Sequence, residues 1–200
     1  MRALPPACVS GKRNQKKDNN YTCIYVGGIL NQYDGKLLLD AFNELYSIDQ
    51  RFHLILICRE PEWNSFQHSY KNAPWLEVHH VSGDELKPYY QRACAGVVVP
   101  NTKMSYNTFL VSVKLFEYIG EGLPVISVNG SAMKEIIESD KIGVTCESDP
   151  KEMAFAINTI MSDGNIYREF QDQVINVAYN KHTWNSRVRT IISDLEAYRS

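Results

Sequence analysis

The sequence predicts an α/β domain: a doubly wound parallel sheet of about six strands, with helices on both faces. Three observations lead to this expectation. Short, almost wholly apolar runs recur along the chain, as in strands buried on both faces of a sheet. Segments with apolar residues at helical spacing separate these runs. After Pro150 only the helical pattern remains, so C-terminal helices should follow the sheet.

The expected strands are the buried apolar runs. They cover residues 22–26, 52–57, 75–80, 95–99, 124–128 and 143–146. The expected helices cover residues 36–46, 63–70, 86–93, 113–120, 132–138, 151–161, 167–179 and 184–198. Ligands of such sheets bind at the carboxyl ends of the strands, near the topological switch point, so the loops that follow the strands should share one crevice.

Composition limits the classes of protein that the chain can represent. Residues 1–20 are mostly polar and basic and are expected to form a flexible linker, with the domain spanning residues 21–200. The net charge of −2 gives no general basic field, so nucleic acid is not an expected partner. No signal peptide is evident, and no run approaches the roughly 18 apolar residues of a membrane span. Five scattered cysteines without a C-x-x-C motif indicate reduced thiols in a cytoplasmic protein.

The stretch KLFEYIGEGLPVIS at positions 114–127 combines a helical pattern, a tight turn and a buried strand. Lys114 and Glu117 project from one face of the expected helix, near its N-terminus, where the helix dipole favours an anion. Ser112 can cap this helix, and Gly122 should end it with a positive φ. A lysine and a carboxylate on one face suit a phosphate and a sugar diol together. The alternative is an ordinary helix with a solvated ion pair.

Gly27 and Gly28 follow the first expected strand, where a glycine turn can bring backbone amides close to a phosphate. The alternative is a simple strand terminator. The G-x-G-x-x-G fingerprint is missing, which disfavours a nicotinamide cofactor, and the P-loop motif is missing as well. The neighbouring His79 and His80 lack further ligands at metal-binding spacing, so one should be exposed and the other packed.

The stretch at 114–127 resembles the donor-site signature of GT-B glycosyltransferases, K-L-x-E-Y-x-A-x-G-x-P-V-I. It looks most like the retaining family-4 enzymes, the glycosyl transferases group 1. Residues 25–29 and 37–42 are similar to the first strand, glycine turn and first helix of the same domain. The resemblance runs from residue 21 to the C-terminus and implies one half of a GT-B fold. That half is the Rossmann-like C-terminal domain, which binds the nucleotide-sugar donor.

In that family a helix-borne glutamate holds the donor's ribose and a nearby lysine holds its diphosphate. The resemblance therefore assigns these catalytic roles to Glu117 and Lys114. The full substrate-binding set that it implies is Gly27, Gly28, Arg59, Ser82, Gly83, Asn101, Thr102, Ser112, Lys114 and Glu117. No cofactor and no metal are expected, because a lysine and a helix end can neutralise the diphosphate.

Two positions depart from the family pattern. Many members carry an arginine directly after the turn glycine, but this chain has Gly28 there, and its nearest later base is Lys36. More of the diphosphate binding should therefore fall to Lys114. A related pattern has a second glutamate eight positions before the first, but this chain has Phe109 there. Its recognition of the donor sugar must therefore differ from that subfamily.

Other loops also match the family by position. Arg59 and the pair Ser82–Gly83 follow the second and third strands, where the family binds the nucleotide base; the alternative is two surface turns. The loop before the key helix carries Asn101, Thr102, Lys103 and Tyr106, and some of these residues are expected to touch the transferred sugar. Trp184 resembles the tryptophan of the family's C-terminal F-S-W element, where the last helix crosses toward the other domain. It is expected to be a packing anchor.

These features predict the donor-binding half of a hexosyltransferase-type glycosyltransferase, which moves a sugar from a nucleoside diphosphate sugar to an acceptor. The isolated chain should be inactive, because an N-terminal acceptor domain is expected to lie outside it. Any association with a membrane surface is expected only through that missing half. Two alternatives remain: a sugar-nucleotide epimerase-type GT-B domain, and a non-catalytic module that binds nucleotide-sugars.

Overall fold

The computed structural model describes residues 6–8, 21–109 and 111–199. Its centre is a six-stranded sheet in the order β3-β2-β1-β4-β5-β6, in which every neighbouring pair is parallel. The strands are β1 (Tyr21–Val26), β2 (Phe52–Ile57), β3 (Leu76–His79), β4 (Ala95–Val98), β5 (Val125–Val128) and β6 (Gly143–Cys146). The predicted doubly wound parallel sheet is confirmed. Only β3 is clearly shorter than its predicted range, because the pairing of this edge strand with β2 ends at His79.

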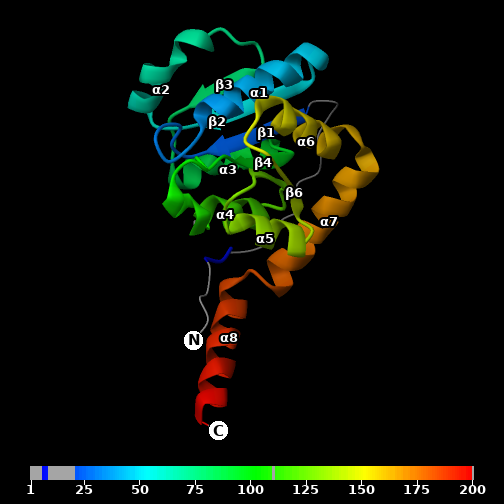
Figure 1. Ribbon diagram of the computed structural model, residues 1–200. Helices are drawn as coiled ribbons and strands as arrows, with labels where there is room; N and C mark the ends of the chain where they lie inside the picture. The colour runs from blue at the N-terminus through cyan, green and yellow to red at the C-terminus, as the bar shows by residue number, and fades with distance from the viewer. Residues whose placement is uncertain (1–5, 9–20, 110, 200) are drawn as a thin grey trace.

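Helices cover both faces of the sheet (Figure 1). They are α1 (Gly35–Ile48), α2 (Glu60–Phe66), α3 (Lys87–Arg92), α4 (Val113–Gly120), α5 (Met133–Ser139), α6 (Pro150–Ser162), α7 (Gly164–Asn180) and α8 (Trp184–Arg199). Three short 3-10 turns are η1 (Gln67–Ser69), η2 (Gly83–Leu86) and η3 (Ser105–Phe109). The predicted helix at 63–70 proves to be α2 followed by η1. It begins earlier than predicted because Pro61 suits the first turn of a helix.

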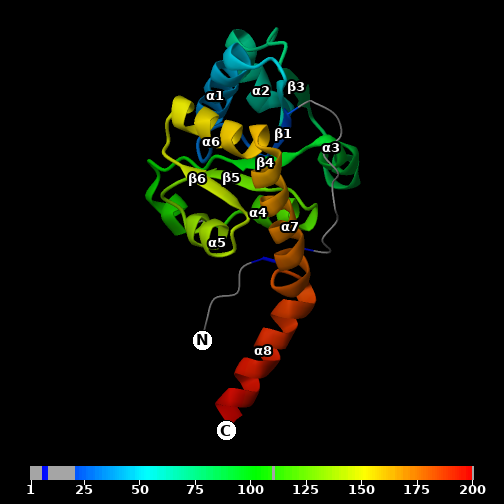
Figure 2. The same ribbon diagram turned by 90° about the vertical axis from the view of Figure 1, so that its right-hand side faces the viewer.

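The two faces of the sheet carry separate hydrophobic cores, because alternate strand residues point to opposite sides. On one face, residues such as Cys23 and Leu54 pack with α1, α2 and α6. On the other face, residues such as Ile24 and Ile55 pack with α3, α4, α5 and α7. Figures 1 and 2 together show α1 and α6 on one side of the sheet and α3, α4 and α5 on the other. Helix α4 therefore reaches the carboxyl ends of the strands from the second face.

The topological switch point lies between β1 and β4. The chain runs outward from β1 through β2 to β3 and then returns to β4 on the other side of β1. The helices that follow β1 and β4, which are α1 and α4, lie on opposite faces of the sheet. In doubly wound sheets ligands bind at the strand ends between two such helices, so this edge is the candidate crevice. The glycine turn after β1 and the N-terminus of α4 both belong to the loops after these two strands.

Helix α8 extends away from the body of the domain (Figures 1 and 2). Trp184, its first residue, is 58% exposed, so the prediction that it is a packing anchor is wrong within this chain. The apolar side chains that follow it along the helix are exposed as well: Val188, Ile191, Ile192, Leu195 and Tyr198. None of the helices described here is long and apolar enough to cross a membrane.

The corner between α7 and α8 is anchored by His182 instead, which is buried. Its Nε2 lies 2.6 Å from a carboxylate oxygen of Asp140, and its Nδ1 lies 2.9 Å from a guanidinium nitrogen of Arg187. Lys181 also pairs with Asp140. Burial is the main cause that lowers the pKa of His182. Because Arg187 can only donate, these contacts fit a neutral imidazole that donates from Nε2 and accepts at Nδ1.

The N-terminal segment meets the same corner at Cys8. The Cys8 amide donates to the carbonyl of His182 at 2.7 Å, and the side chain is buried. This residue of the predicted linker therefore packs on the domain, whereas residues 1–5 and 9–20 lie outside the described part of the chain. All five cysteines are free and buried.

Candidate functional site

Helix α4 places Lys114 and Glu117 at the crevice. Leu115, Phe116 and Tyr118 point into the core, which leaves the other two side chains on the outer face. The Ser112 hydroxyl accepts a hydrogen bond from the Lys114 amide at 3.2 Å, so the predicted cap is confirmed. Lys114 Nζ lies 3.1 Å and 2.9 Å from the two carboxylate oxygens of Glu117.

The end of α4 also follows the prediction. Gly122 has a φ of 72°, the left-handed conformation that glycine adopts at low cost. The Leu123 amide then donates to the carbonyl of Tyr118 at 2.9 Å, and Pro124 leads into β5. This turn fixes the length of α4 and hence the position of its N-terminus at the sheet edge.

Tyr90 is a site residue that the sequence analysis missed. It lies on α3, is buried, and donates its hydroxyl to Oε2 of Glu117 at 2.7 Å. Burial is the main cause that raises the pKa of Tyr90, so the hydroxyl stays protonated and remains a donor. A tyrosine on the buried face of a helix has the same sequence pattern as a core residue, and only the packing of α3 beside α4 reveals the contact.

Tyr118 connects α4 to the glycine turn. Its hydroxyl accepts a hydrogen bond from the Val26 amide at 3.0 Å, at the end of β1. Its ring lies directly on Gly96 of β4, where a Cβ atom would come within 2.3 Å of the ring. Glycine at this position therefore allows α4 to approach the sheet closely enough for the Tyr118 hydroxyl to reach the end of β1.

The turn after β1 contains Gly27 and Gly28, as predicted, and Gly27 has a φ of 155°. Its amide donates to the Ile57 carbonyl at 2.9 Å, and the Ile29 amide donates to a carboxylate oxygen of Glu62 at 2.7 Å. Glu62, which comes from α2, is not among the residues predicted from the sequence. A carboxylate beside the turn would repel a phosphate, so we expect the binding of an anion to depend still more on Lys114.

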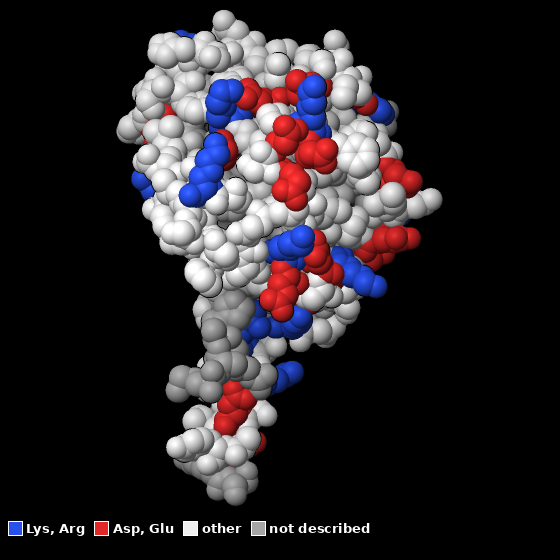
Figure 3. All heavy atoms as spheres, in the orientation of Figure 1, with Lys and Arg blue, Asp and Glu red and all other residues white. Residues whose placement is uncertain are grey.

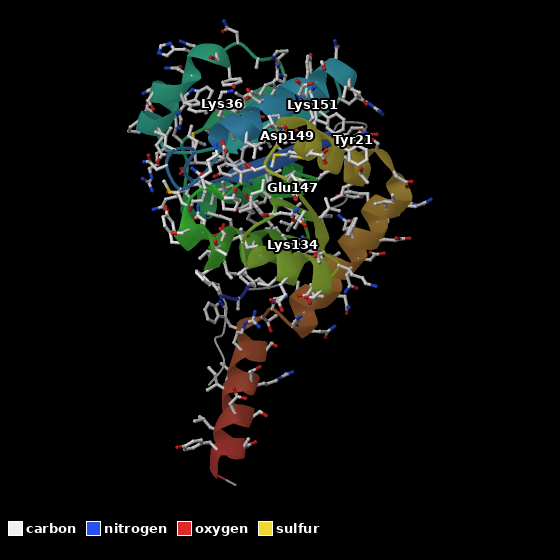
Figure 4. The ribbon with its side chains drawn as sticks, viewed as in Figure 1. Tyr21, Lys36, Lys134, Glu147, Asp149 and Lys151 are labelled. Atoms are coloured by element: carbon white, nitrogen blue, oxygen red, sulfur yellow. The ribbon has the colours of Figure 1, made fainter. Side chains whose placement is uncertain are left out.

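Lys36 does not supply a positive charge to the glycine turn. Its ammonium pairs with Asp40 on the outer surface of α1 and its side chain is largely exposed (Figure 4). Arg59 is 81% exposed on its side chain and lies 3.2 Å from Glu62. Lys114, in contrast, lies in the first turn of α4.

The loop after β4 is joined to the loop after β1. The Asn101 amide donates to the Gln32 carbonyl at 2.9 Å, and its side chain donates to the Asn31 carbonyl at 3.0 Å. The buried Asn107 amide group donates to the carbonyls of both Gln32 and Asn101, at 2.9 Å and 2.8 Å. Asn101, predicted to touch a sugar, is therefore used at least in part to hold these loops together.

Three buried side-chain oxygens on the loops after β4 and β5 have no hydrogen-bond partner within the described residues: Oδ1 of Asn107, Oδ1 of Asn129 and Oγ of Ser131. Buried polar atoms are normally paired, so the asparagine oxygens could accept a hydrogen bond from a bound polar molecule, and the Ser131 hydroxyl could donate or accept one. The Ala132 amide donates a hydrogen bond to the Thr108 carbonyl at 2.9 Å, and Thr102 packs beside Gly130. The loops after β4 and β5 therefore form one wall of the crevice.

The remaining predicted residues lie on the loops after β2 and β3. Ser82 and Gly83 are exposed, and Gly83 has a φ of 60°. His80 is exposed, whereas His79 is half-buried and contacts Glu77 and Tyr89, so the expected division of the histidine pair is confirmed. Within the residues described, no cluster of three or more histidine, cysteine or carboxylate side chains could hold a metal ion.

The doubly wound parallel sheet with helices on both faces defines a Rossmann-like α/β domain. The chain belongs to the family described as glycosyl transferases group 1, whose model matches residues 20–163. No curated protein matches the chain in sequence.

Solved structures support the same fold. The C-terminal domain of LpcC from Francisella tularensis, a group 1 family protein, has a TM-score of 0.68 and 14% identity, with 88% of this chain and 89% of that chain covered. HepE from Anabaena, in complex with UDP and glucose, has a TM-score of 0.71 and 14% identity, with 89% and 48% covered. The pneumococcal O-GlcNAc transferase GtfA, in complex with UDP and GlcNAc, has a TM-score of 0.73 and 12% identity, with 96% and 38% covered. The chain thus spans less than half of HepE and GtfA.

Proposed function

We propose that this chain is the donor-binding half of a hexosyltransferase-type glycosyltransferase, which transfers a sugar from a nucleoside diphosphate sugar to an acceptor. The observation that carries the proposal is the Lys114–Glu117 pair at the N-terminus of α4, beside the switch point. The structures of HepE and GtfA, which hold UDP together with a sugar, support it by similarity of fold.

Each residue of the pair has a separate task in this proposal. Glu117 accepts hydrogen bonds from the ribose hydroxyls, which fixes the nucleotide. Lys114 and the N-terminal end of α4 neutralise the negative charge that grows on the diphosphate as it leaves. Because a lysine and a helix dipole supply this positive charge, we propose that the reaction uses no metal ion and no cofactor.

The transferred sugar would lie against the loops after β4 and β5. Oδ1 of Asn107 and Oγ of Ser131 are buried there without partners among the described residues, and sugar hydroxyls can both donate and accept. Thr102 lies in the same wall. These side chains would take the place of the glutamate that related enzymes carry where this chain has Phe109.

We also propose that an N-terminal acceptor domain completes the enzyme. The exposed apolar side chains of α8 support this, because a surface patch of that kind usually marks a protein interface. Five free buried thiols support a cytoplasmic location. On the face shown in Figure 3, acidic and basic side chains are interspersed, which gives that face no strong basic field for nucleic acid. Any contact with a membrane would come through the other half.

The proposal is tested by titrating wild type, Glu117→Ala and Lys114→Ala with UDP, GDP, ADP, TDP and the matching nucleosides. Loss of Glu117 removes charge-assisted hydrogen bonds of roughly 1.5–3 kcal/mol each, so both nucleoside and diphosphate should bind about tenfold or more weakly. Lys114→Ala should weaken the diphosphate but not the bare nucleoside, which offers no phosphate.

Lys134→Ala is the matched control, because Lys134 also forms an ion pair with a glutamate of its own helix, Glu138 on α5 (Figure 4). It should leave every affinity unchanged. If α4 carried only a surface ion pair, its loss would cost under about 1 kcal/mol of stability and would not affect any ligand. Equal nucleotide affinities across all four proteins would remove the donor-site assignment.

A further inference from the structure

The Glu117 carboxylate is held by two donors of very different character. The side chain of Lys114 is half-exposed, and its Nζ lies 3.1 Å and 2.9 Å from the two carboxylate oxygens of Glu117. Tyr90 reaches only Oε2, at 2.7 Å, and its ring is buried. Lysine has four flexible side-chain bonds, whereas a buried tyrosine ring is fixed by its neighbours.

Those neighbours hold Tyr90 firmly. Its ring packs edge-on against the ring of Tyr118, with the centroids 6.1 Å apart. Tyr118 is fully buried on Gly96 and its hydroxyl accepts from the Val26 amide. The Tyr90 hydroxyl therefore has a fixed position relative to both the glycine turn and α4.

The proposed function requires Lys114 and Glu117 to bind different parts of one ligand. In the free protein they bind each other, so Lys114 must leave the carboxylate when it meets a diphosphate. A carboxylate that lost its only partner would be free to change rotamer, and the ribose contact depends on its direction. Tyr90 is the donor that can stay.

We propose that Tyr90 is a positioning residue: its hydroxyl keeps Glu117 aimed at the ribose while Lys114 exchanges the carboxylate for the donor diphosphate. This inference rests on the proposed function. It explains why a buried tyrosine on α3 donates its hydroxyl to a partly exposed carboxylate on α4. In this proposal Lys114 contacts Glu117 in the free protein and the diphosphate in the complex, whereas Tyr90 keeps its hydrogen bond to Glu117 in both.

Tyr90→Phe tests the proposal, because it removes the hydroxyl and keeps the ring. The probes are the nucleoside diphosphate that binds wild type best, its 2′-deoxy analogue, its nucleoside, and inorganic pyrophosphate. The variant should bind the nucleoside and the diphosphate about fivefold to tenfold more weakly, a smaller loss than that of Glu117→Ala, because Tyr90 acts only through the carboxylate. Its preference for ribose over 2′-deoxyribose should shrink by a similar factor, whereas pyrophosphate binding should stay within about twofold.

Tyr167→Phe is the matched control, because Tyr167 is also buried and donates its hydroxyl to a carbonyl, that of Cys94, on the other face of the sheet. It should not change the preference for ribose. The double variant Tyr90→Phe/Glu117→Ala should bind no more weakly than Glu117→Ala alone, because Tyr90 acts through Glu117.

The outcomes separate this inference from the proposed function. If Glu117→Ala weakens nucleoside binding but Tyr90→Phe leaves affinity and ribose preference intact, the positioning role is refuted and the donor site stands. An equal loss of pyrophosphate and nucleoside binding in Tyr90→Phe also refutes it, since it would indicate general structural damage. If Glu117→Ala itself has no effect, the proposed function fails first.

Discussion

Replacing Gly96 with alanine tests the close packing that positions α4. A Cβ atom at Gly96 would lie 2.3, 2.4 and 2.8 Å from three ring atoms of Tyr118, well inside normal contact distances. The Tyr118 ring is fully buried and its hydroxyl is bonded to the Val26 amide, so it cannot turn aside. Helix α4 must then move away from β4, and Lys114 and Glu117 must move with it.

The size of the effect follows from these contacts. Overpacking of a core typically costs about 1–3 kcal/mol, and an alanine in a strand regains roughly 0.5–1 kcal/mol relative to glycine. We therefore expect a net loss of about 1–2 kcal/mol. For a domain of this size, that lowers the melting temperature by about 2–8 °C. Nucleotide affinity should also fall, because α4 carries both proposed ligand contacts.

The assay compares Gly96→Ala with Gly164→Ala by thermal and urea denaturation and by nucleotide titration. Gly164 is the first residue of α7, and a Cβ there would meet nothing within 4 Å, so the control should be neutral or slightly stabilised. Wild-type stability and wild-type affinity in Gly96→Ala would contradict the close approach of Tyr118 to β4, and with it the account of how α4 is placed.

Two further predictions concern the corner of the domain and the isolated chain. Burial lowers the pKa of His182 in the folded protein below its ordinary value of 6.5. As the pH falls, His182 is therefore protonated in the unfolded chain before it is protonated in the folded protein. The contribution of neutral His182 to the free energy of unfolding should be complete above about pH 6.5 and should be lost as the pH falls toward the pKa of the folded state. Urea denaturation across pH 5 to 8 should accordingly give a shallower pH dependence for His182→Gln, and identical slopes in the two proteins would contradict this. The purified chain should bind donor yet transfer no sugar, since an acceptor surface is needed to exclude water and align the acceptor. Transfer measured with a radiolabelled nucleotide-sugar, in the absence of another protein, would show that the chain is more than a donor-binding half.

Local features were well predicted from the sequence. Strands, the Ser112 cap and the Gly122 turn depend on neighbouring residues, whose preferences the sequence displays directly. Tyr90 and Glu62 could not be identified, because their roles depend on helices that meet only in three dimensions. Trp184 was misjudged for a different reason: a large aromatic residue indicates burial, but α8 leaves the body of the domain at that residue.

The joined loops at the switch point have a consequence for ligand binding. Asp34 and Asn101 donate their amides across the two loops at 2.9 Å, Tyr33 forms an antiparallel bridge with Pro100, and Asn107 links both sides. Neither loop can rearrange without breaking contacts of the other. The chain entropy that ordering a flexible rim would require has therefore already been lost on folding, and a nucleotide that binds there as proposed would meet a preorganised edge.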